Sequence, residues 1–401
     1  MHGGPSPSNQ PPAAPGWYFL QVPGPTNVPE RVTRALMQPT IDHRSPMFAA
    51  LTRRVLEKIG RVFMTNAPVI IYPSSGTGAW EAALVNTLSA GDKVLMFETG
   101  HFATLWANLA RRLGLDVLLL PDDWRHPVNI ARLAEALAQD KAHAIKAVAI
   151  VHNETSTGVV SSVPAVRQAL DDAKHPALLM VDTVSSLGSI EYRHDDWGVD
   201  LAVSASQKGL MLPPGLGFNA ISAKALEAHK QSKLPRSYWD WTEMLNSNRT
   251  GFFPYSPATN MLQGLDESLS MLFEEGLDNV FARHVRHAEA ARRAVDAWGL
   301  ELVPAQRDTA SPTLTAIMAP AGCDIDAFRG EILRRFNMSL GAGLGKLAGT
   351  AVRIGHLGGL NDLMLAAALS GVEMGLSVSA IPHRKGGVSA ALDYLAATSE
   401  S

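Results

Sequence analysis

The sequence predicts an α/β protein with a mostly parallel central sheet that carries helices on both faces, followed by a smaller C-terminal α+β domain. Short apolar runs alternate with helical patterns over most of the chain, which is typical of parallel sheets because a crossover helix connects each strand to the next. After about residue 275 a long helical segment introduces a different order of elements. We therefore predict a disordered N-terminal arm at residues 1–20, a large domain at 21–275 and a small domain at 276–401.

The strands of the large domain are predicted from short apolar runs that are bounded by polar or turn-forming residues. They lie at residues 69–72, 93–97, 116–120, 147–151, 177–181 and 201–203. Helical patterns between them include residues 78–88, 105–113, 130–139 and 165–173. The small domain is predicted to contain a helix at 279–297 and further elements at 314–318, 327–336 and 351–354.

Composition and charge exclude several classes of function. An apolar content of 46% and a charged content of 18% are those of a globular enzyme, and no apolar run is long enough to span a membrane. The formal charge of −3 and the absence of basic clusters argue against nucleic acid or an anionic membrane as a partner. The single cysteine, Cys323, permits no intrachain disulfide and fits a reducing compartment, so we predict a cytoplasmic location. The Pro/Gly/Ser-rich arm lacks the charged and apolar regions of a signal peptide.

One lysine stands just beyond the strand predicted at 201–203. Lys208 is followed by glycines and prolines that forbid a helix and fix a tight path for the chain. Desolvation lowers the pKa of a lysine, and the neutral amine is the form that attacks carbonyl groups. Lys208 is therefore a candidate for a Schiff-base lysine that holds pyridoxal phosphate (PLP). The alternative is a surface lysine at a strand–loop junction, which is the commoner situation for a lone lysine.

A candidate anion site follows the strand predicted at 69–72. Ser75, Gly76 and Thr77 are small residues at the start of a predicted helix, where free N–H groups and hydroxyls can bind a phosphate. An ordinary capped helix start explains the same residues equally well.

A carboxylate occupies the corresponding place after the strand predicted at 177–181. Asp182 leaves an apolar run, where a carboxylate is costly unless a cation meets it, and a protonated PLP ring nitrogen is such a cation. The alternative is an N-cap for the next segment. Because ligands of open α/β sheets bind beyond the carboxyl ends of the strands, Asp182 and Lys208 are expected in one crevice.

Three more residues follow predicted strands. Thr155 has a hydroxyl that can donate to the phenolate oxygen or the phosphate of PLP. The ring of Phe102 can stack on a flat cofactor, although core packing is the commoner role of a lone Phe. His152 fits a packed histidine better than a catalytic one and is left without a role.

Six motifs occur in an order that resembles the class V, fold-type I PLP-dependent aminotransferases. They are SSGTGAWEAAL, ETGHF, HNETSTG, LLMVDTVSSLG, SASQKG and AVRIGHLG. The chain is most similar to the serine–glyoxylate, aspartate–glyoxylate and alanine–glyoxylate enzymes, and the openings PGPTNVPERV and IDHRSP resemble the bacterial members. The resemblance extends from about residue 23 to the final helix.

The resemblance implies specific roles at the cofactor. Lys208 is implied as the Schiff-base lysine and Asp182 as the partner of the pyridinium. Further cofactor contacts are implied for the phosphate-loop residues Ser75, Gly76 and Thr77, for the stacking residue Phe102, and for Thr155 and Gln207 at the oxygen atoms of PLP.

The resemblance also implies a substrate and an assembly. Arg353 matches the arginine that clamps the substrate carboxylate, and Ser256 matches a position that reaches the phosphate of the neighbouring subunit in a homodimer with composite sites. The implied reaction transfers the amino group of a small amino acid, with L-serine favoured, to glyoxylate, which gives glycine and hydroxypyruvate. L-aspartate, L-alanine and another class V PLP activity stay open. Aspartate would need a second cation, for which Arg44 and Arg236 are candidates unless they form structural ion pairs. No metal is expected.

Two rival functions fail on the sequence. A cysteine desulfurase needs a thiolate shortly before the carboxylate-binding arginine, and residues 337–350 contain no cysteine. A nucleotide-binding protein is suggested by the glycine-rich segment 341–346, but the Walker pattern needs Ser or Thr after Lys346, where Leu347 stands, and the dinucleotide spacing is also wrong.

Overall fold

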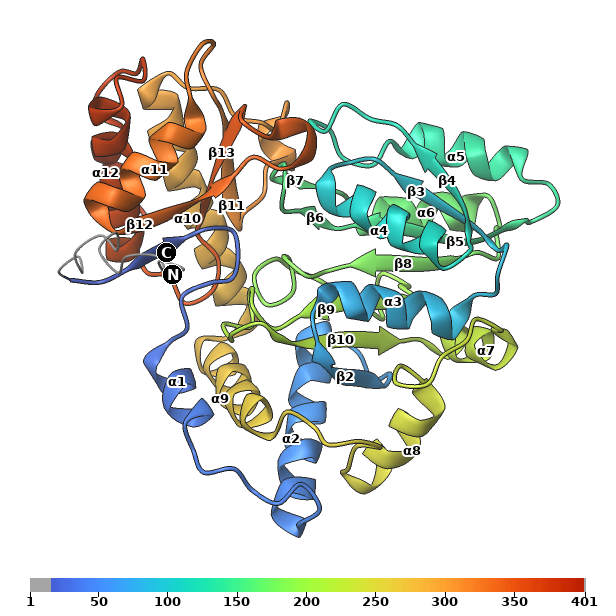
Figure 1. Cartoon of the computed structure of the whole chain (residues 1–401). Coiled ribbons are helices and arrows are strands. Elements are labelled where there is room, and N and C mark those ends of the chain that lie inside the picture. Colours follow the sequence, from blue (N-terminus) through green and yellow to red (C-terminus); the bar gives the residue numbers. More distant parts are fainter. Residues whose placement is uncertain (1–15, 400–401) are drawn as a thin grey trace, which may run out of the picture.

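The structure is a computed structural model that describes residues 16–399, so residues 1–15 of the predicted arm lie outside the described residues (Figure 1). A seven-stranded sheet has the order β2-β10-β9-β8-β5-β3-β4. Its strands are β2 (Val69–Ser74), β10 (Gly215–Ile221), β9 (Leu201–Ala205), β8 (Leu178–Asp182), β5 (Ile145–Val151), β3 (Lys93–Phe97) and β4 (Asp116–Leu120). Only β10 runs against its neighbours in this sheet, which confirms the predicted mostly parallel arrangement.

Helices cover both faces of the large sheet, as predicted (Figure 1). One core is closed by α2 (Pro46–Phe63), α5 (Ile130–Gln139), α6 (Val163–Asp172) and α9 (Thr259–Glu275), against which α1 (Glu30–Leu36) packs. The other core is closed by α3 (Gly76–Thr87), α4 (His101–Arg112), α7 (Ala223–Gln231) and α8 (Trp241–Thr250). Along β2, Ile71 enters the first core, while Ile70 and Tyr72 enter the second, because successive strand residues point to opposite faces.

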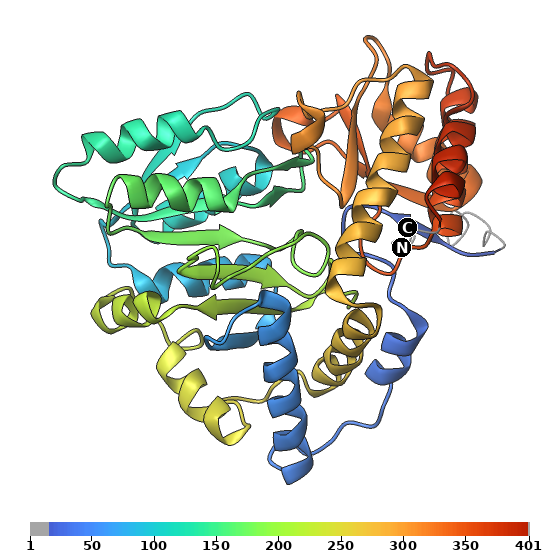
Figure 2. The same ribbon diagram turned by 180° about the vertical axis from the view of Figure 1, so that it is seen from behind.

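A four-stranded sheet of order β1-β12-β13-β11 forms a second unit. Its strands are β1 (Phe19–Gln21), β12 (Met338–Ala342), β13 (Ala351–Gly355) and β11 (Leu314–Met318). The helices α10 (Leu277–Trp298), α11 (Ile325–Phe336), α12 (Asp362–Val378) and α13 (Gly387–Ala397) share its core. Figure 2 shows α10 running from the large unit into this one. The predicted boundary at 275/276 falls between α9 and α10, and the division into two domains there stays a prediction.

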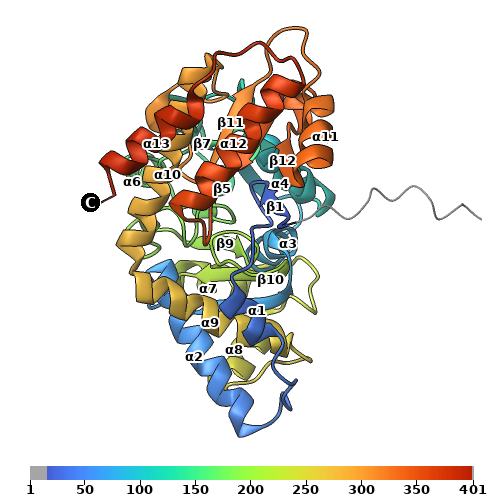
Figure 3. The same cartoon turned by 90° about the vertical axis from the view of Figure 1, so that its left-hand side faces the viewer.

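Three strands of the two sheets, β1, β10 and β12, are not among the elements predicted from the sequence. The prediction places residues 19 and 20 in the disordered arm, but β1 pairs in parallel with β12, with Phe19 opposite Met338 (Figure 3). A three-residue strand whose partner lies more than 300 residues away leaves no periodic signal. The glycine-rich path after Lys208 was expected only to exclude a helix, yet it opens β10, which fills the sheet between β2 and β9.

The remaining strands form a small hairpin beside the large sheet. It consists of β6 (Asn153–Glu154) and β7 (Val159–Val160), which pair antiparallel directly after β5. Within residues 16–399, no helix has both the length and the apolar character needed to cross a bilayer.

Candidate functional site

A cavity of about 220 Å³ lies at the carboxyl ends of the parallel strands. Eight predicted site residues line it together: Ser75, Gly76, Thr77, Phe102, Thr155, Asp182, Gln207 and Lys208. These residues lie at or just after the ends of β2, β3, β5, β8 and β9, the edge at which open α/β sheets bind ligands. The volume is below the roughly 300–1,000 Å³ of sites for drug-sized ligands, so the cavity suits a small ligand.

The N-terminus of α3 opens into this cavity without a capping group. Ser75 is the N-cap residue by position, but its side chain makes no capping hydrogen bond, and the first turn contains no acidic residue. The hydroxyl-bearing residues Ser75 and Thr77 are both exposed at the cavity. The first N–H groups of a helix are unsatisfied and carry partial positive charge. Of the two explanations for this segment, the geometry favours the anion site over the capped helix start.

The N-terminus of the neighbouring helix α4, in contrast, is capped by a side chain. Glu154 on β6 is buried, and its carboxylate accepts the backbone N–H of Ala103 at 3.0 Å and that of Phe102 at 3.4 Å. The same carboxylate accepts the N–H and the hydroxyl of Ser156, at 3.0 and 2.6 Å. A side chain at Gly100 would collide with Glu154, since a Cβ there would lie 2.3 Å from Glu154 Cγ. Glu154 therefore fixes the helix turn that presents the Phe102 ring to the cavity.

Asp182 ends β8 with both carboxylate oxygens paired. Oδ1 accepts the backbone N–H of Val184 at 2.7 Å, and Oδ2 accepts the indole N–H of Trp80 at 2.8 Å. Burial raises the pKa of Asp182 to about 7, although these two hydrogen bonds work against the rise. A cation at the cavity would favour the ionised form, as a protonated pyridine nitrogen would do.

Lys208 lies in a buried position after β9. Burial, reinforced by the positive charge of Arg353, lowers the pKa of Lys208 to about 7, so its amine is near the balance between charged and neutral forms at neutral pH. The amine donates to the carbonyl oxygen of Pro23. Gly24 has a φ of +101°, and a Cβ there would lie within 2.5 Å of three Lys208 side-chain atoms. Glycine at 24 thus lets the N-terminal segment lie directly on the lysine.

Arg353 reaches the same region from β13. Its Nε donates to the Ala342 carbonyl and its Nη1 to the Thr155 carbonyl, each at 2.8 Å. Burial lowers the pKa of Arg353 to about 10, while the negative charge of Glu154 opposes this shift. The hydrogen bond to Thr155 connects the C-terminal sheet to a residue that lines the cavity. The third guanidinium nitrogen, Nη2, makes no hydrogen bond to any of residues 16–399.

Two buried polar atoms near the cavity lack partners among the described residues. Gln207 Oε1 and Asn153 Oδ1 accept no hydrogen bond, although both side chains belong to the cavity lining. The Asn153 amide nitrogen is fully used, because it donates to Ser185 and, at 2.8 Å, to Thr313 Oγ1. Buried acceptors without donors are costly. The uncapped α3, the buried carboxylate of Asp182 and the buried amine of Lys208 match the phosphate, the ring nitrogen and the aldehyde of PLP, so these residues fit that cofactor.

Ser256 and Arg44 lie apart from this cavity. They share a separate hollow of about 470 Å³ with His43 and residues 252–255. Both side chains are exposed. Arg236 is the other candidate for a second cation, but its guanidinium already has partners in the same chain. It donates to Asp240 at 3.1 Å and to the hydroxyl of Ser232 at 2.8 Å.

His152 is packed rather than presented to a ligand. It is buried, its Nδ1 lies 3.0 Å from Ser186 Oγ, and its ring contacts Tyr192 and Trp197. Burial lowers its pKa to about 4, so the ring is neutral at physiological pH. This agrees with leaving His152 without a catalytic role.

The glycine-rich segment before Arg353 is used for packing against the large unit. Lys346 Nζ lies 2.6 Å from Glu98 Oε1 and 5.3 Å from the centre of the Trp124 ring. Gly345–Leu347 forms only a short 3-10 turn. The lysine of the rejected nucleotide motif therefore has a protein partner.

Sequence reasoning missed several cavity residues. They are Gly24, Pro25, Trp80, Val151, Asn153, Val184 and Pro214. Gly24, Trp80 and Asn153 lie within motifs that the chain shares with the family. Their residue types, however, are more typical of packing or of a turn than of contact with a ligand. The signals that the sequence does contain are a glycine between two prolines at position 24 and an indole in an Ala-rich helix at position 80.

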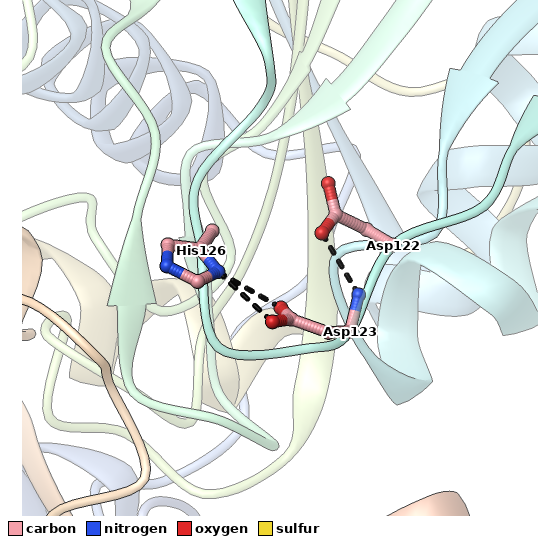
Figure 4. Close-up of side chains that lie close together, drawn as sticks. All are labelled: Asp122, Asp123 and His126. Carbon is pink, nitrogen blue, oxygen red and sulfur yellow. Dashed lines mark hydrogen bonds and ion pairs between the residues drawn. The ribbon is translucent and has the colours of Figure 1, made fainter.

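One group of side chains has the arrangement of metal ligands. Asp122, Asp123 and His126 lie close together in the loop after β4 (Figure 4). His126 Nδ1 is 3.0 Å from both carboxylate oxygens of Asp123, which also accepts the N–H of Arg125 at 2.8 Å. These contacts account for the cluster as loop structure, and it lines no part of the cavity.

Comparison with known proteins agrees with the motifs. A model of the family "Aminotransferase class-V" matches residues 18–326. The serine–glyoxylate aminotransferase of Methylorubrum extorquens is 48% identical over 95% of this chain and 96% of its own length. The L-aspartate–glyoxylate aminotransferase of Paracoccus denitrificans is 46% identical over 93% and 95%, respectively. Among solved structures, ureidoglycine–glyoxylate aminotransferase from Bacillus subtilis has a TM-score of 0.89 at 26% identity and covers 96% of this chain and 100% of that one. The protein belongs to the class V aminotransferases, as the order of its six motifs predicts.

Proposed function

We propose that the protein uses PLP to transfer the amino group of L-serine to glyoxylate, which gives glycine and hydroxypyruvate. The observation that carries the proposal is the single cavity that holds Lys208, Asp182 and the uncapped N-terminus of α3. Glyoxylate as acceptor is supported by three relatives whose names share it and differ in the donor, namely serine, aspartate and ureidoglycine.

The cofactor would be held at three points. The phosphate would lie at Ser75, Gly76 and Thr77, where the first turn of α3 offers unsatisfied N–H groups and no competing carboxylate. Asp182 would face the pyridine nitrogen. Phe102 would lie against the ring, with Thr155 and Gln207 at its oxygen atoms. PLP, when bound, supplies an electron sink for negative charge that develops at the substrate α-carbon.

Lys208 would have two roles that both need a neutral amine. It would join the aldehyde of the cofactor, and it would then carry the proton that leaves the substrate α-carbon. Burial supports both roles, because it lowers the pKa of Lys208 to about 7 and a neutral amine is therefore present at physiological pH. Asp182 would keep its negative charge beside the pyridine nitrogen and so hold the proton there.

Arg353 would bind the carboxylate of either substrate. Its free Nη2 lies on a guanidinium that the Ala342 and Thr155 carbonyls already orient. An arginine held in this way loses little conformational freedom when a carboxylate binds, and its charge is not lost at neutral pH. Glyoxylate is a small acceptor and an aldehyde, so it needs little room beside the cofactor and is more electrophilic than a ketone.

We also propose a homodimer in which each active site uses residues of both subunits. The support is that Ser256 and Arg44 are exposed in their own hollow and do not line the cavity of the same chain. A second copy would bring them to the phosphate and the substrate. A cytoplasmic location stays part of the proposal, supported by the single, unpaired Cys323.

A specific observation keeps L-aspartate as the second candidate donor. Arg236 is bound to Asp240 and Ser232, whereas the Arg44 side chain makes no ion pair with any described residue. Arg44 is thus the available cation for a second carboxylate. L-alanine needs no such partner and stays an alternative.

A donor panel tests the proposal. The kcat/KM values of serine, aspartate and alanine are measured against glyoxylate, first with the wild type and then with Arg44→Gln. Serine should be the best donor, and its value should change little in the variant. A preference for aspartate that Arg44→Gln abolishes would establish the second candidate instead. A better rate with 2-oxoglutarate than with glyoxylate would contradict the acceptor.

The cofactor assignment has its own test. Borohydride reduction of the protein with PLP should trap the cofactor on Lys208, as seen by peptide mass mapping. Lys208→Ala should lose both the adduct and the visible absorbance. An adduct on another lysine would overturn the assignment.

A further inference from the structure

Among the described residues, Trp80 is the cavity residue whose side chain donates a hydrogen bond to the carboxylate of Asp182. It lies on α3, slightly more than one turn after Gly76, and its Nε1 is 2.8 Å from Asp182 Oδ2. Both side chains are almost fully buried, with 4% of Trp80 and 3% of Asp182 exposed. The other oxygen, Oδ1, is held by the N–H of Val184. The plane of the carboxylate is therefore fixed by two donors from different elements.

The Trp80 ring is itself held in place. It stacks on Trp106 of α4, with ring centres 5.8 Å apart and planes within 12° of parallel. Trp106 is fully buried, and its own Nε1 has no acceptor among the described residues. The two indoles thus differ in one respect: only the Trp80 N–H points at a carboxylate.

The hydrogen bond matters because the carboxylate is buried. A buried carboxylate tends to take up a proton, and a donor to its charged form opposes that tendency. Glu154 adds a negative charge that favours protonation of Asp182, and Lys208 adds a positive charge that opposes it. Because the negative charge of Glu154 opposes ionisation, the hydrogen bonds from Trp80 and Val184 contribute much of the stabilisation of the ionised form of Asp182.

We propose that Trp80 is a positioning residue whose indole N–H keeps Asp182 ionised and oriented toward the ring nitrogen of the cofactor. The inference rests on the proposed function for the identity of the cofactor. The hydrogen bond and its effect on the charge of Asp182 are properties of the chain alone, so they are measurable without PLP.

The first experiment compares Trp80→Phe with the matched control Trp106→Phe. Both substitutions keep an aromatic ring in the same stack, and only the first removes a donor from Asp182. Urea unfolding of the cofactor-free proteins is followed at pH 5.5 and 8.5. Asp182 is ionised at the higher pH in the wild type, so the stability deficit of Trp80→Phe should widen from pH 5.5 to 8.5. The deficit of Trp106→Phe should stay constant. Equal behaviour of the two variants would overturn the proposal.

The loaded enzyme gives a second measurement. Loss of a hydrogen bond to a charged group corresponds to about a 10- to 100-fold effect, which should appear in kcat for Trp80→Phe with little change in KM. Trp106→Phe should stay near the wild type. If the wild type fails to bind PLP at Lys208, the proposed function fails, while the unfolding data still decide the role of the hydrogen bond.

A third measurement needs no change at Trp80, in case that variant does not fold. In cofactor-free protein labelled with ¹⁵N-tryptophan, one indole N–H signal should move between pH 5.5 and 8.5 as Asp182 ionises. That movement should be absent in Asp182→Asn and retained in Trp106→Phe. If Asp182→Asn leaves the pH response of every indole signal unchanged, the proposal is wrong.

Discussion

Lys208→Met should alter the pH dependence of stability in a way that reveals the cost of burying the lysine. In the cofactor-free protein the pKa of Lys208 is about 7, against 10.5 for the free side chain. Between these values the unfolded chain binds a proton that the folded chain does not. The stability of the wild type must therefore rise with pH over this range. The methionine variant lacks this contribution.

The magnitude follows from the two pKa values. With about 1.4 kcal/mol per pKa unit, the burial of Lys208 costs about 3 kcal/mol at pH 8 and about 1 kcal/mol at pH 10. The stability of Lys208→Met relative to the wild type should thus fall by about 2 kcal/mol between these pH values. The lost bond to the Pro23 carbonyl adds a cost of about 1–3 kcal/mol that does not depend on pH. Asp182, with a pKa of about 7, is ionised throughout, and the titration of Arg353 is common to both proteins.

The assay is urea unfolding of both cofactor-free proteins at pH 8, 9 and 10. Lys141→Met removes an exposed lysine and serves as the control for losing the charge alone. Any pH dependence that the control shares with Lys208→Met is subtracted. A difference between Lys208→Met and the wild type that stays constant from pH 8 to 10 would refute the reasoning, because it would mean that the folded protein carries a protonated lysine.

Three further predictions concern the other buried charges. Asp182→Asn should still bind PLP, measured by absorbance titration, but should lower kcat by orders of magnitude, since an amide cannot hold the ring nitrogen protonated; a near-normal kcat would contradict its role. Arg353→Lys should cost about 2–4 kcal/mol in kcat/KM for every donor and acceptor alike, and an effect on one substrate only would argue against a common carboxylate clamp. Glu154→Gln should lower the free energy of unfolding by about 1–3 kcal/mol, because its amide would turn a donor toward the N–H groups that Glu154 accepts; the exposed Glu57→Gln is the control, and equal losses would dismiss the capping role.

The strand-end residues were predictable because their signal is local. Lys208, Asp182 and Ser75 each stand within five residues of the end of an apolar run, and the arrangement of the strands brings such positions to one edge. The bounds of β3, β4, α5 and β11 were also predicted to the residue, since each is limited by a clear change from apolar to polar or turn-forming residues.

The parts that could not be predicted depend on partners far away in the chain. Trp80 and Asp182 are 102 residues apart, and Arg353 and Thr155 are 198 apart, so neither hydrogen bond leaves a trace in local composition. The strand β1 could not be predicted for the same reason, because its partner β12 lies more than 300 residues away. The capping role of Glu154 could not be predicted, because the N-terminus of the helix that it caps precedes it by more than 50 residues.

The helices α3 and α4 differ in how their N-termini are capped. This difference indicates which of the two can bind an anionic ligand. Both helices begin near the cavity with a glycine in or next to the N-cap position, Gly76 in α3 and Gly100 at α4. Glu154 occupies the N-terminus of α4, whereas the N-terminus of α3 receives no side chain. We therefore expect an anion of the ligand to bind at the N-terminus of α3, while the capped α4 presents Phe102 to the cavity.

The buried charges also bear on the composite site. Of the charged residues that line the cavity, Asp182 is opposed by Lys208, so the lining is close to balanced before any ligand binds. A phosphate monoester adds about −1.5 to −2 charge and a helix N-terminus offers only about +0.5. A substrate carboxylate adds a further negative charge. The described residues of the cavity contain no additional cation, while Arg44 is exposed and makes no ion pair with any of residues 16–399. This deficit is the physical reason to expect that a second subunit completes the site.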